Sequence, residues 1–324
     1  MTKAFEFDSI LSTYLQGVIE EKRSAGYTYD TEGMILKRFD QYCIDKHLKS
    51  TKITKEFLSD WMSQSDDEKE MQQAKRISCV RQLLLYMASM GMDVYIPSHF
   101  CNFGVHLTHI LAPEELSAFF HELDLLTTES HARHSKRMIF EYRMLFRLIY
   151  CCGLRNSEAA GIAMKNVNLD NGVLSIYNSK GRKDRLVYMQ DDLTGLCRDY
   201  YSELSQHLNC FPEWLFPGMN INQPIPNTSV DNKFSVIWSR TEYAETCTKK
   251  PTVHSLRFTF VVNRINEWIR EGADINVMLP YLSRYLGHKT VNETFYYYYY
   301  VKEANDIVRE KDKTSKLVIP EVML

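Results

Sequence analysis

The chain has 324 residues, of which 44% are hydrophobic and 25% are charged, a composition that excludes a disordered or collagen-like polypeptide. Its 39 basic and 41 acidic side chains give a formal net charge of −2. This balance excludes a strongly basic, histone-like binder but leaves room for a local basic patch, and the length predicts about two domains.

The first hundred residues have apolar side chains at three- and four-residue spacing, which is typical of amphipathic helices. We expect four helices, near residues 7–19, 29–47, 54–62 and 75–90. Together they predict a helical bundle over residues 1–95. Residues 96–112 contain Pro97 and Gly104 and show no clear period, so we interpret them as a linker.

The remainder of the chain predicts a mainly α domain with a small β-sheet over residues 113–305. Short β-branched and aromatic runs at 173–177 and 185–189 flank the sequence NSKGRKD, a pattern that indicates a β-hairpin with a basic tip. The expected helices lie near 113–125, 136–152, 157–162, 192–207, 229–241, 255–270, 275–284 and 290–306. Residues 306–324 form a tail with an apolar end.

Positive charge gathers in one part of this second domain. Residues 131–185 contain 11 Lys or Arg and 4 Asp or Glu, a net of 11 − 4 = +7. One interpretation is a solvated helix face followed by a charged turn. The other is a groove for a polyanion. The candidate DNA contacts are Arg133, Lys136, Arg137, Arg182, Lys183 and Arg185.

The eight cysteines form no C-x-x-C pair, and the N-terminus does not have the pattern of a secretory signal. No apolar run reaches the roughly 18 residues of a membrane span. These features predict reduced thiols and a cytoplasmic protein without a membrane partner.

Four short segments of the second domain contain side chains that suit phosphodiester chemistry. They are CGLRNSE with Arg155, the hairpin tip with Lys180, HSLR with His254 and Arg257, and LGHKTVNETFYYYYY with His288. Each alone also fits a structural role, such as a surface ion pair or a packed aromatic helix. Together they favour one reaction, because arginines stabilise a charged phosphoryl transition state and tyrosine can act as a covalent nucleophile. No metal-ligand motif is evident in the sequence, so we expect no metal and no cofactor.

These segments, in this order and spacing, resemble the tyrosine recombinases, also called phage-type integrases, over residues 108–305. The resemblance implies that Arg155 is the first catalytic arginine and that Glu158 supports it. It also implies catalytic roles for Lys180, His254, Arg257 and His288. The family's nucleophile lies nine residues after the last of these, at 288 + 9 = 297, which selects Tyr297, with Tyr296 and Tyr298 as alternatives. One departure is Phe258, where the family usually has a second histidine.

The resemblance implies a clamp around a double-stranded DNA core site, with one domain on each face. Tyrosine attack would form a 3′-phosphotyrosyl bond and release a 5′-hydroxyl protonated by Lys180, without ATP or metal. Two protomers would occupy each site and four would form the synapse, with an accessory protein allowed. The tail would dock either onto its own domain or into a neighbouring protomer. The outcome would be integration, excision, inversion or resolution of a DNA element. Alternatives are a type IB topoisomerase and a non-catalytic DNA-binding regulator.

Overall fold

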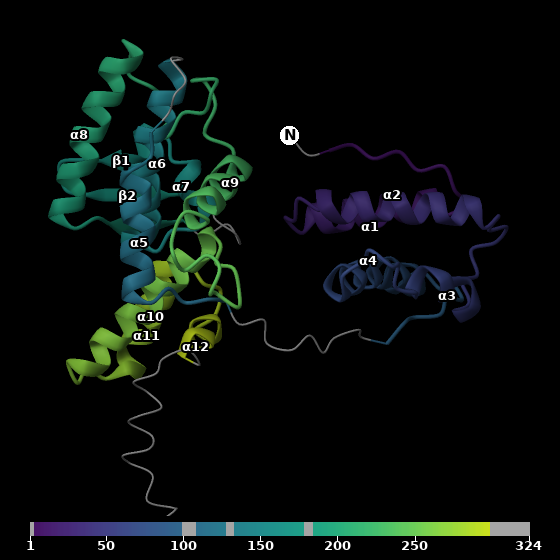
Figure 1. The fold of residues 1–324 in the computed structure, drawn as a ribbon. Helices are drawn as coiled ribbons and strands as arrows, with labels where there is room; N and C mark the ends of the chain where they lie inside the picture. Colours follow the sequence, from purple (N-terminus) through teal and green to yellow (C-terminus); the bar gives the residue numbers. More distant parts are fainter. Residues whose placement is uncertain (1–2, 99–107, 128–132, 178–183, 299–324) are drawn as a thin grey trace, which may run out of the picture. The chain divides into compact units, whose positions relative to one another are not determined.

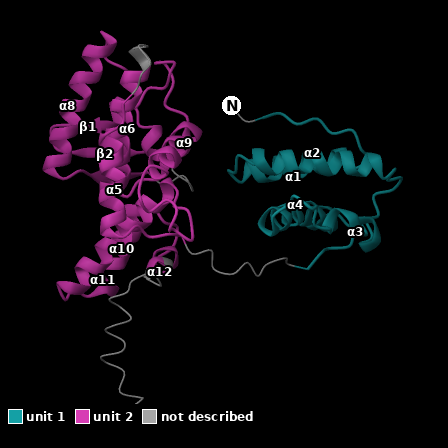
Figure 2. Ribbon diagram, viewed as in Figure 1, with its two compact units in different colours: residues 1–106 teal, residues 107–324 magenta. Residues whose placement is uncertain are grey.

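The computed structural model describes residues 3–98, 108–127, 133–177 and 184–298. The chain divides into two compact units, residues 1–106 and residues 107–324 (Figures 1 and 2). Among the described helices, none is both long and apolar enough to cross a membrane.

Unit 1 is a bundle of helices around one apolar core. The helices are α1 (Ser12–Ser24), α2 (Asp30–Asp45), α3 (Lys55–Met62) and α4 (Glu70–Ser89), as the apolar spacing predicts. Their inner faces bury a continuous set of side chains that includes Leu15, Leu36, Phe39 and Leu83.

Two helix starts in unit 1 differ from the prediction. Helix α1 begins at Ser12 rather than near residue 7, because the buried Asp40 carboxylate accepts hydrogen bonds from the amides of Asp8 (2.9 Å) and Ser9 (3.0 Å). These bonds hold the preceding segment outside the helix. Helix α4 begins five residues earlier than expected, at Glu70, through a polar turn that has no apolar periodicity.

Unit 2 is mainly helical, as expected, with a small antiparallel sheet. Helix α6 (Arg133–Cys152) packs on both α8 and α10 and lies in the middle of the unit in Figure 1. The other helices are α5 (Pro113–Asp124), α7 (Asn156–Ala160), α8 (Asp191–Leu208), α9 (Asn227–Trp238), α10 (Val253–Arg270), α11 (Ile275–Leu286), α12 (Asn292–Tyr298) and the 3-10 helix η1 (Met164–Asn166).

The sheet has the order β1 (Val167–Asn168), β2 (Val173–Ile176) and β3 (Arg185–Tyr188). The predicted hairpin is confirmed as the antiparallel β2–β3 pair, with Val173 opposite Tyr188 and Ile176 opposite Arg185. Strand β1 is only two residues long, too short to show the alternation that marks a strand in sequence. The basic tip, residues 178–183, lies outside the described residues.

The end of the predicted linker packs into unit 2. Leu111 is buried in the core of this unit, and its amide donates a hydrogen bond of 3.0 Å to Thr259 Oγ1 on α10. Residues 108–112 are therefore structurally part of unit 2, which corrects their assignment to the linker. The expected tail, residues 306–324, lies outside the described residues.

Candidate active site

Arg155 and Glu158 meet at the start of α7. Gly153 adopts a left-handed conformation (φ 60°) directly after α6, and Arg155 is the N-cap residue of α7. The Glu158 carboxylate accepts hydrogen bonds from the Arg155 amide (2.9 Å) and from Arg155 Nη1 (2.7 Å). The structure thus brings together the arginine and the supporting acid that the sequence motif pairs.

Glu158 also holds two further arginines. Arg185, on β3, donates to both carboxylate oxygens of Glu158, at 3.0 and 2.7 Å, and Arg257 Nη1 lies 3.8 Å away. Burial would raise the pKa of the Glu158 carboxyl, but its bonds to Arg185 and Arg155 lower it to about 2. The carboxylate is therefore ionised at neutral pH, and three guanidinium groups around it give a local charge of 3 − 1 = +2.

Arg257 connects the segments that form the site. Its side chain is 1% exposed on α10, and it donates to the carbonyl oxygens of Gly153 (2.7 Å) and Leu286 (2.8 Å). The pKa of Arg257 lies below its usual value, because burial and the nearby Arg155 outweigh the opposing effects of Tyr297 and Glu158. Among the described residues, no hydrogen-bond partner reaches Arg257 Nε.

His288 is held in one orientation beside Arg257. It follows Gly287, which ends α11 in a left-handed conformation (φ 69°). Burial and the neighbouring Arg257 lower the pKa of His288 to about 3, so the imidazole is neutral. Its Nε2 accepts from Arg257 Nη2 (3.2 Å), because a guanidinium only donates. The ring proton therefore lies on Nδ1 and is donated to Thr294 Oγ1 (2.7 Å).

Tyr297, on α12, is 4% exposed and lies in a row of aromatic rings. Its ring is stacked on His288, with centroids 5.7 Å apart at 12°, and contacts Phe258 at 4.5 Å. Phe258 in turn contacts the exposed His254 at 4.8 Å. The phenylalanine that replaces the usual histidine therefore packs between His254 and Tyr297. The side chains of Tyr296 and Tyr298 lie outside the described residues.

A cavity of about 840 Å³ opens over these groups. Five predicted catalytic residues line it, namely Arg155, His254, Arg257, His288 and Tyr297. The sixth, Lys180, belongs to the hairpin tip and lies outside the described residues. The arrangement combines fixed cations, a neutral imidazole and a phenol in one cleft, which suits transfer of a phosphoryl group to the phenol oxygen.

The candidate DNA contacts divide into two groups. Lys136 is exposed, whereas the side chains of Arg133, Arg182 and Lys183 lie outside the described residues. Arg137 is buried, paired with Glu141, and donates to the carbonyl oxygens of Pro217 and Gly218. Arg185 is likewise inside, with its side chain 6% exposed. Internal ion pairs occupy both guanidinium groups, which corrects the prediction that Arg137 and Arg185 contact DNA.

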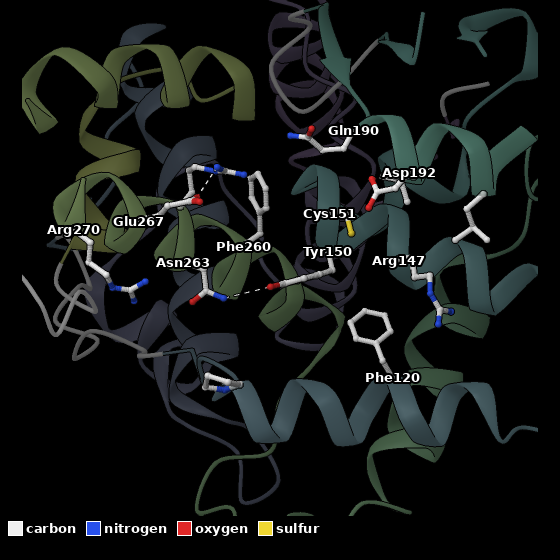
Figure 3. Close-up of a pocket in the computed structure, with 14 residues that line it drawn as sticks. Phe120, Arg147, Tyr150, Cys151, Gln190, Asp192, Phe260, Asn263, Glu267 and Arg270 are labelled. Carbon is white, nitrogen blue, oxygen red and sulfur yellow. Dashed lines mark hydrogen bonds and ion pairs between the residues drawn. The ribbon is translucent and has the colours of Figure 1, made fainter. Parts of the chain in front are cut away.

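A larger cavity, of about 1020 Å³, lies elsewhere on unit 2 (Figure 3). Its wall includes Tyr150 and Cys151 of α6 and Asn263 of α10, and Asn263 Nδ2 donates to the Tyr150 hydroxyl at 3.3 Å. None of its described lining residues belongs to the predicted catalytic set. The sequence motifs therefore select the smaller of these two cavities.

The sequence did not predict that two residues, Arg185 and Thr294, support the site. Arg185 was assigned to DNA because it follows the basic hairpin tip, but it is a principal partner of Glu158. Thr294, which is fully buried, orients His288 from six residues further along the chain. The spacing from His288 to Thr294 spans a helix end and a helix start, so no helical period in the sequence marks the pair.

Comparison with known proteins assigns unit 2 to a family. Residues 111–304 match the model of the phage integrase family. A protein of Sinorhizobium fredii provisionally named integrase/recombinase y4rB is 30% identical over 160 residues, 48% of this chain and 50% of that protein. The chain thus spans about half the length of the first curated relatives that it matches. Tyrosine recombinase XerD of Staphylococcus aureus is 22% identical over 90% of this chain and 93% of that protein.

Solved structures share the fold. A XerH site-specific recombinase bound to palindromic difH substrate has a TM-score of 0.63 at 18% identity, over 92% of this chain and 83% of the other. A lambda integrase dimer bound to a COC′ core site has a TM-score of 0.57 at 15% identity, over 89% and 76% of the two chains.

Proposed function

The chain belongs to the phage integrase family, and from this premise we propose that it is a site-specific recombinase that cuts and rejoins DNA through a 3′-phosphotyrosyl intermediate. The observation that carries the proposal is that Tyr297 lines the same cavity as Arg155 and Arg257 and is stacked on His288, the imidazole to which Arg257 donates. This arrangement supports the assignment of Tyr297 as a nucleophile beside cations that suit a phosphate.

The charge beside the cavity fits a phosphodiester. The cluster around Glu158 has a surplus of +2, and two of its guanidinium groups, those of Arg155 and Arg257, line the cavity, whereas a phosphodiester brings −1. The Nε–H of Arg257 is a buried donor whose partner a non-bridging phosphate oxygen would supply. Because Glu158 and backbone carbonyls already fix the guanidinium groups, little reorganisation is needed when the transition-state charge develops.

The reaction needs one bond to form and one to break at each step. Tyr297 Oη loses its proton to solvent and attacks the scissile phosphorus, the bond to the 5′-oxygen breaks, and that oxygen takes a proton, which we assign to Lys180. The 5′-hydroxyl of a partner strand then attacks the phosphorus of the phosphotyrosyl bond and gives its proton back to Lys180, and the released Tyr297 oxygen takes a proton from solvent. Phosphodiester energy is conserved in the covalent link, so the scheme uses neither ATP nor a metal ion.

We assign His288 an orienting role rather than that of a proton acceptor in the described arrangement. Its Nε2 lone pair is engaged by Arg257, and its Nδ1 proton by Thr294. The parallel ring of His288 supports the ring of Tyr297. Because the Nε2 lone pair of His288 already accepts from Arg257, it is not available to take the phenol proton. We therefore assign the stabilisation of charge on the phenol oxygen to the adjacent Arg257 guanidinium.

The assembly on DNA follows the proposed reaction. The similar lambda integrase has been solved as a dimer on a core site and as a tetramer on a Holliday junction. We propose that this chain acts in the same way in the cytoplasm, with two protomers on each core site and four in the synapse. Its affinity for DNA should fall with salt, because phosphate contacts release counterions.

Covalent trapping tests the proposal. The full chain is incubated, without added metal, with labelled nicked duplexes that carry the ends of the DNA element flanking its gene, or with a randomised core library. An SDS-stable protein–DNA band is expected for the wild type and for the control Tyr281→Phe, whose side chain is exposed on α11. The band should be absent for Tyr297→Phe.

The other outcomes distinguish the alternatives. A band that survives Tyr297→Phe but is lost in Tyr296→Phe or Tyr298→Phe would move the nucleophile. Relaxation of supercoiled plasmid without exchange of partners would indicate a topoisomerase. Specific DNA binding without any covalent band would indicate a non-catalytic regulator.

A further inference from the structure

Three side chains of metal-ligand type meet in unit 2, away from the cavity that holds Tyr297. They are His109, just before α5, Glu115, in the first turn of α5, and Cys247, between α9 and α10. His109 Nε2 lies 2.8 and 3.0 Å from the two Glu115 oxygens. Cys247 Sγ lies 3.7 Å from His109 Nδ1 and 3.9 Å from Nε2. An imidazole, a carboxylate and a thiol thus converge from chain segments that are 138 residues apart.

The separations suit one tetrahedral cation. Zinc lies about 2.0–2.1 Å from nitrogen or oxygen ligands and about 2.3 Å from sulfur, so tetrahedral ligand atoms lie roughly 3.3 Å (N to O) and 3.6 Å (N to S) apart. All candidate ligand atoms here lie within 4.8 Å of one another. The nitrogen-to-sulfur distances of 3.7 and 3.9 Å are close to this geometry, and the 2.8 and 3.0 Å between nitrogen and oxygen would lengthen slightly as an ion enters, with a fourth position left for water.

The ligand types select the class of metal. A thiolate with an imidazole disfavours Mg²⁺ and Ca²⁺, which prefer oxygen, and favours a Zn²⁺-like ion. The cluster is also partly screened from water, because Cys247 packs against the hydrophobic core and His109 lies 6.3 Å from the Trp238 ring. Partial burial strengthens a charged site relative to one on an open surface.

The hydrogen bonds already present do not prevent binding. Glu115 Oε2 accepts from the Ala112 amide at 2.8 Å and caps α5, which leaves Oε1 for a cation. Cys247 Sγ donates to the Lys249 carbonyl oxygen at 2.9 Å, and this proton would be released to solvent as the thiolate binds. The imidazole would give up its contact with Glu115 and bind as the neutral ring.

We propose that His109, Glu115 and Cys247 bind one Zn²⁺-class ion that fastens the start of unit 2 to the segment leading into α10. The Leu111 amide already bonds to Thr259 of α10 nearby, so the ion would reinforce an existing contact. Helix α10 carries Arg257, and the site therefore supports the catalytic cleft without entering the reaction. The proposal is independent of the proposed recombinase activity.

Cobalt(II) titration of the full chain, after dialysis against chelator, tests the site. One equivalent should bind and produce the absorption of a thiolate–cobalt charge-transfer band, which Zn²⁺ then abolishes. Zn²⁺ at about one hundred times its Kd should raise the Tm of unit 2 by roughly 5–10 °C. Both effects should be lost in Cys247→Ser and kept in Cys210→Ser, a control at an exposed cysteine.

His109→Gln provides a second variant, so that poor folding of Cys247→Ser does not decide the result. It should fold, as judged by circular dichroism, and bind cobalt at least tenfold more weakly. Absence of the charge-transfer band in the folded wild type, or its persistence in both ligand variants, would overturn the proposal. The cluster would then be an ion pair beside a thiol.

Discussion

Replacement of Glu158 by glutamine tests the electrostatic centre of the cleft. The change keeps the shape of the side chain but removes the charge that holds Arg155, Arg185 and Arg257 together. Lowering the pKa from its usual 4.5 to about 2 corresponds to about 3 kcal/mol of stabilisation. We therefore expect Glu158→Gln to lower the free energy of unfolding by about 3 kcal/mol at pH 7, because three cations lose their partner.

The pH dependence follows from the sign of the shift. The folded state holds the Glu158 proton more weakly than the unfolded state, so the stabilisation is fully present above about pH 4.5. It is lost as the pH falls toward 2. The difference in the free energy of unfolding between wild type and Glu158→Gln should therefore become smaller below pH 4.5. His288 titrates in both proteins, so their difference isolates the carboxylate to a first approximation.

Urea unfolding in a Trp61→Phe background measures this difference in the free energy of unfolding. The remaining tryptophans, Trp214, Trp238 and Trp268, all belong to unit 2, so fluorescence reports on that unit. The matched control is Glu267→Gln, which removes an exposed carboxylate 2.6 Å from Arg264 at the same three-residue spacing. It should lower stability by less than about 0.5 kcal/mol. Two outcomes would refute the reasoning. One is an equal loss of stability in Glu158→Gln and Glu267→Gln, and the other is a stability difference between wild type and Glu158→Gln that stays constant from pH 4.5 to pH 3.

Three further changes test the parts around this centre. Gly153→Ala should destabilise unit 2 by about 1–2 kcal/mol more than Gly272→Ala in the same urea assay. Both glycines have positive φ, but a Cβ at Gly153 would lie 2.5 Å from Phe260, whereas at Gly272 it meets no described atom within 4 Å. Thr294→Val removes the acceptor of the His288 Nδ1 proton and should slow single-turnover cleavage about tenfold. Thr290→Val, a control at an exposed threonine, should leave the rate unchanged. Equal cleavage rates for the two variants would contradict the proposed role of Thr294 in orienting His288. Phe258→Leu should cleave more slowly than Phe258→His, which keeps a ring against Tyr297, and the reverse order would argue against ring packing.

Local patterns predicted the elements of the fold well. Apolar periodicity found the helices, and β-branched runs found the hairpin, because both signals lie within one element. The α1 start was misplaced because Asp40, some thirty residues away, binds the amides of Asp8 and Ser9. Strand β1 was missed because its two residues pair with β2 without a pattern of their own.

Charge counting was a weaker guide, because it does not distinguish an exposed cation from a buried one. Arg137 and Arg185 counted toward the basic stretch, yet both satisfy carboxylates inside unit 2. The partner of Arg137, Glu141, lies at helical spacing and was visible in the sequence. The partner of Arg185 lies 27 residues away, and only the folded sheet and α7 bring the two together. In the same way, the sequence did not indicate that His109 and Cys247 lie together, because they are 138 residues apart.

The segments of the proposed catalytic site could be recognised together in the sequence because they are physically interdependent. Arg257 bonds to the carbonyl oxygens of Gly153, beside the first arginine motif, and of Leu286, beside the last histidine motif. Those carbonyls point at the guanidinium because one glycine ends α6 and another ends α11, each in the left-handed region. A change in either turn would move Arg155 or His288 and also remove an acceptor from a fully buried cation. The turn glycines, the arginine and the histidine therefore form one structural unit, which is why motifs that each fit an ordinary role alone identify a single site when they occur together.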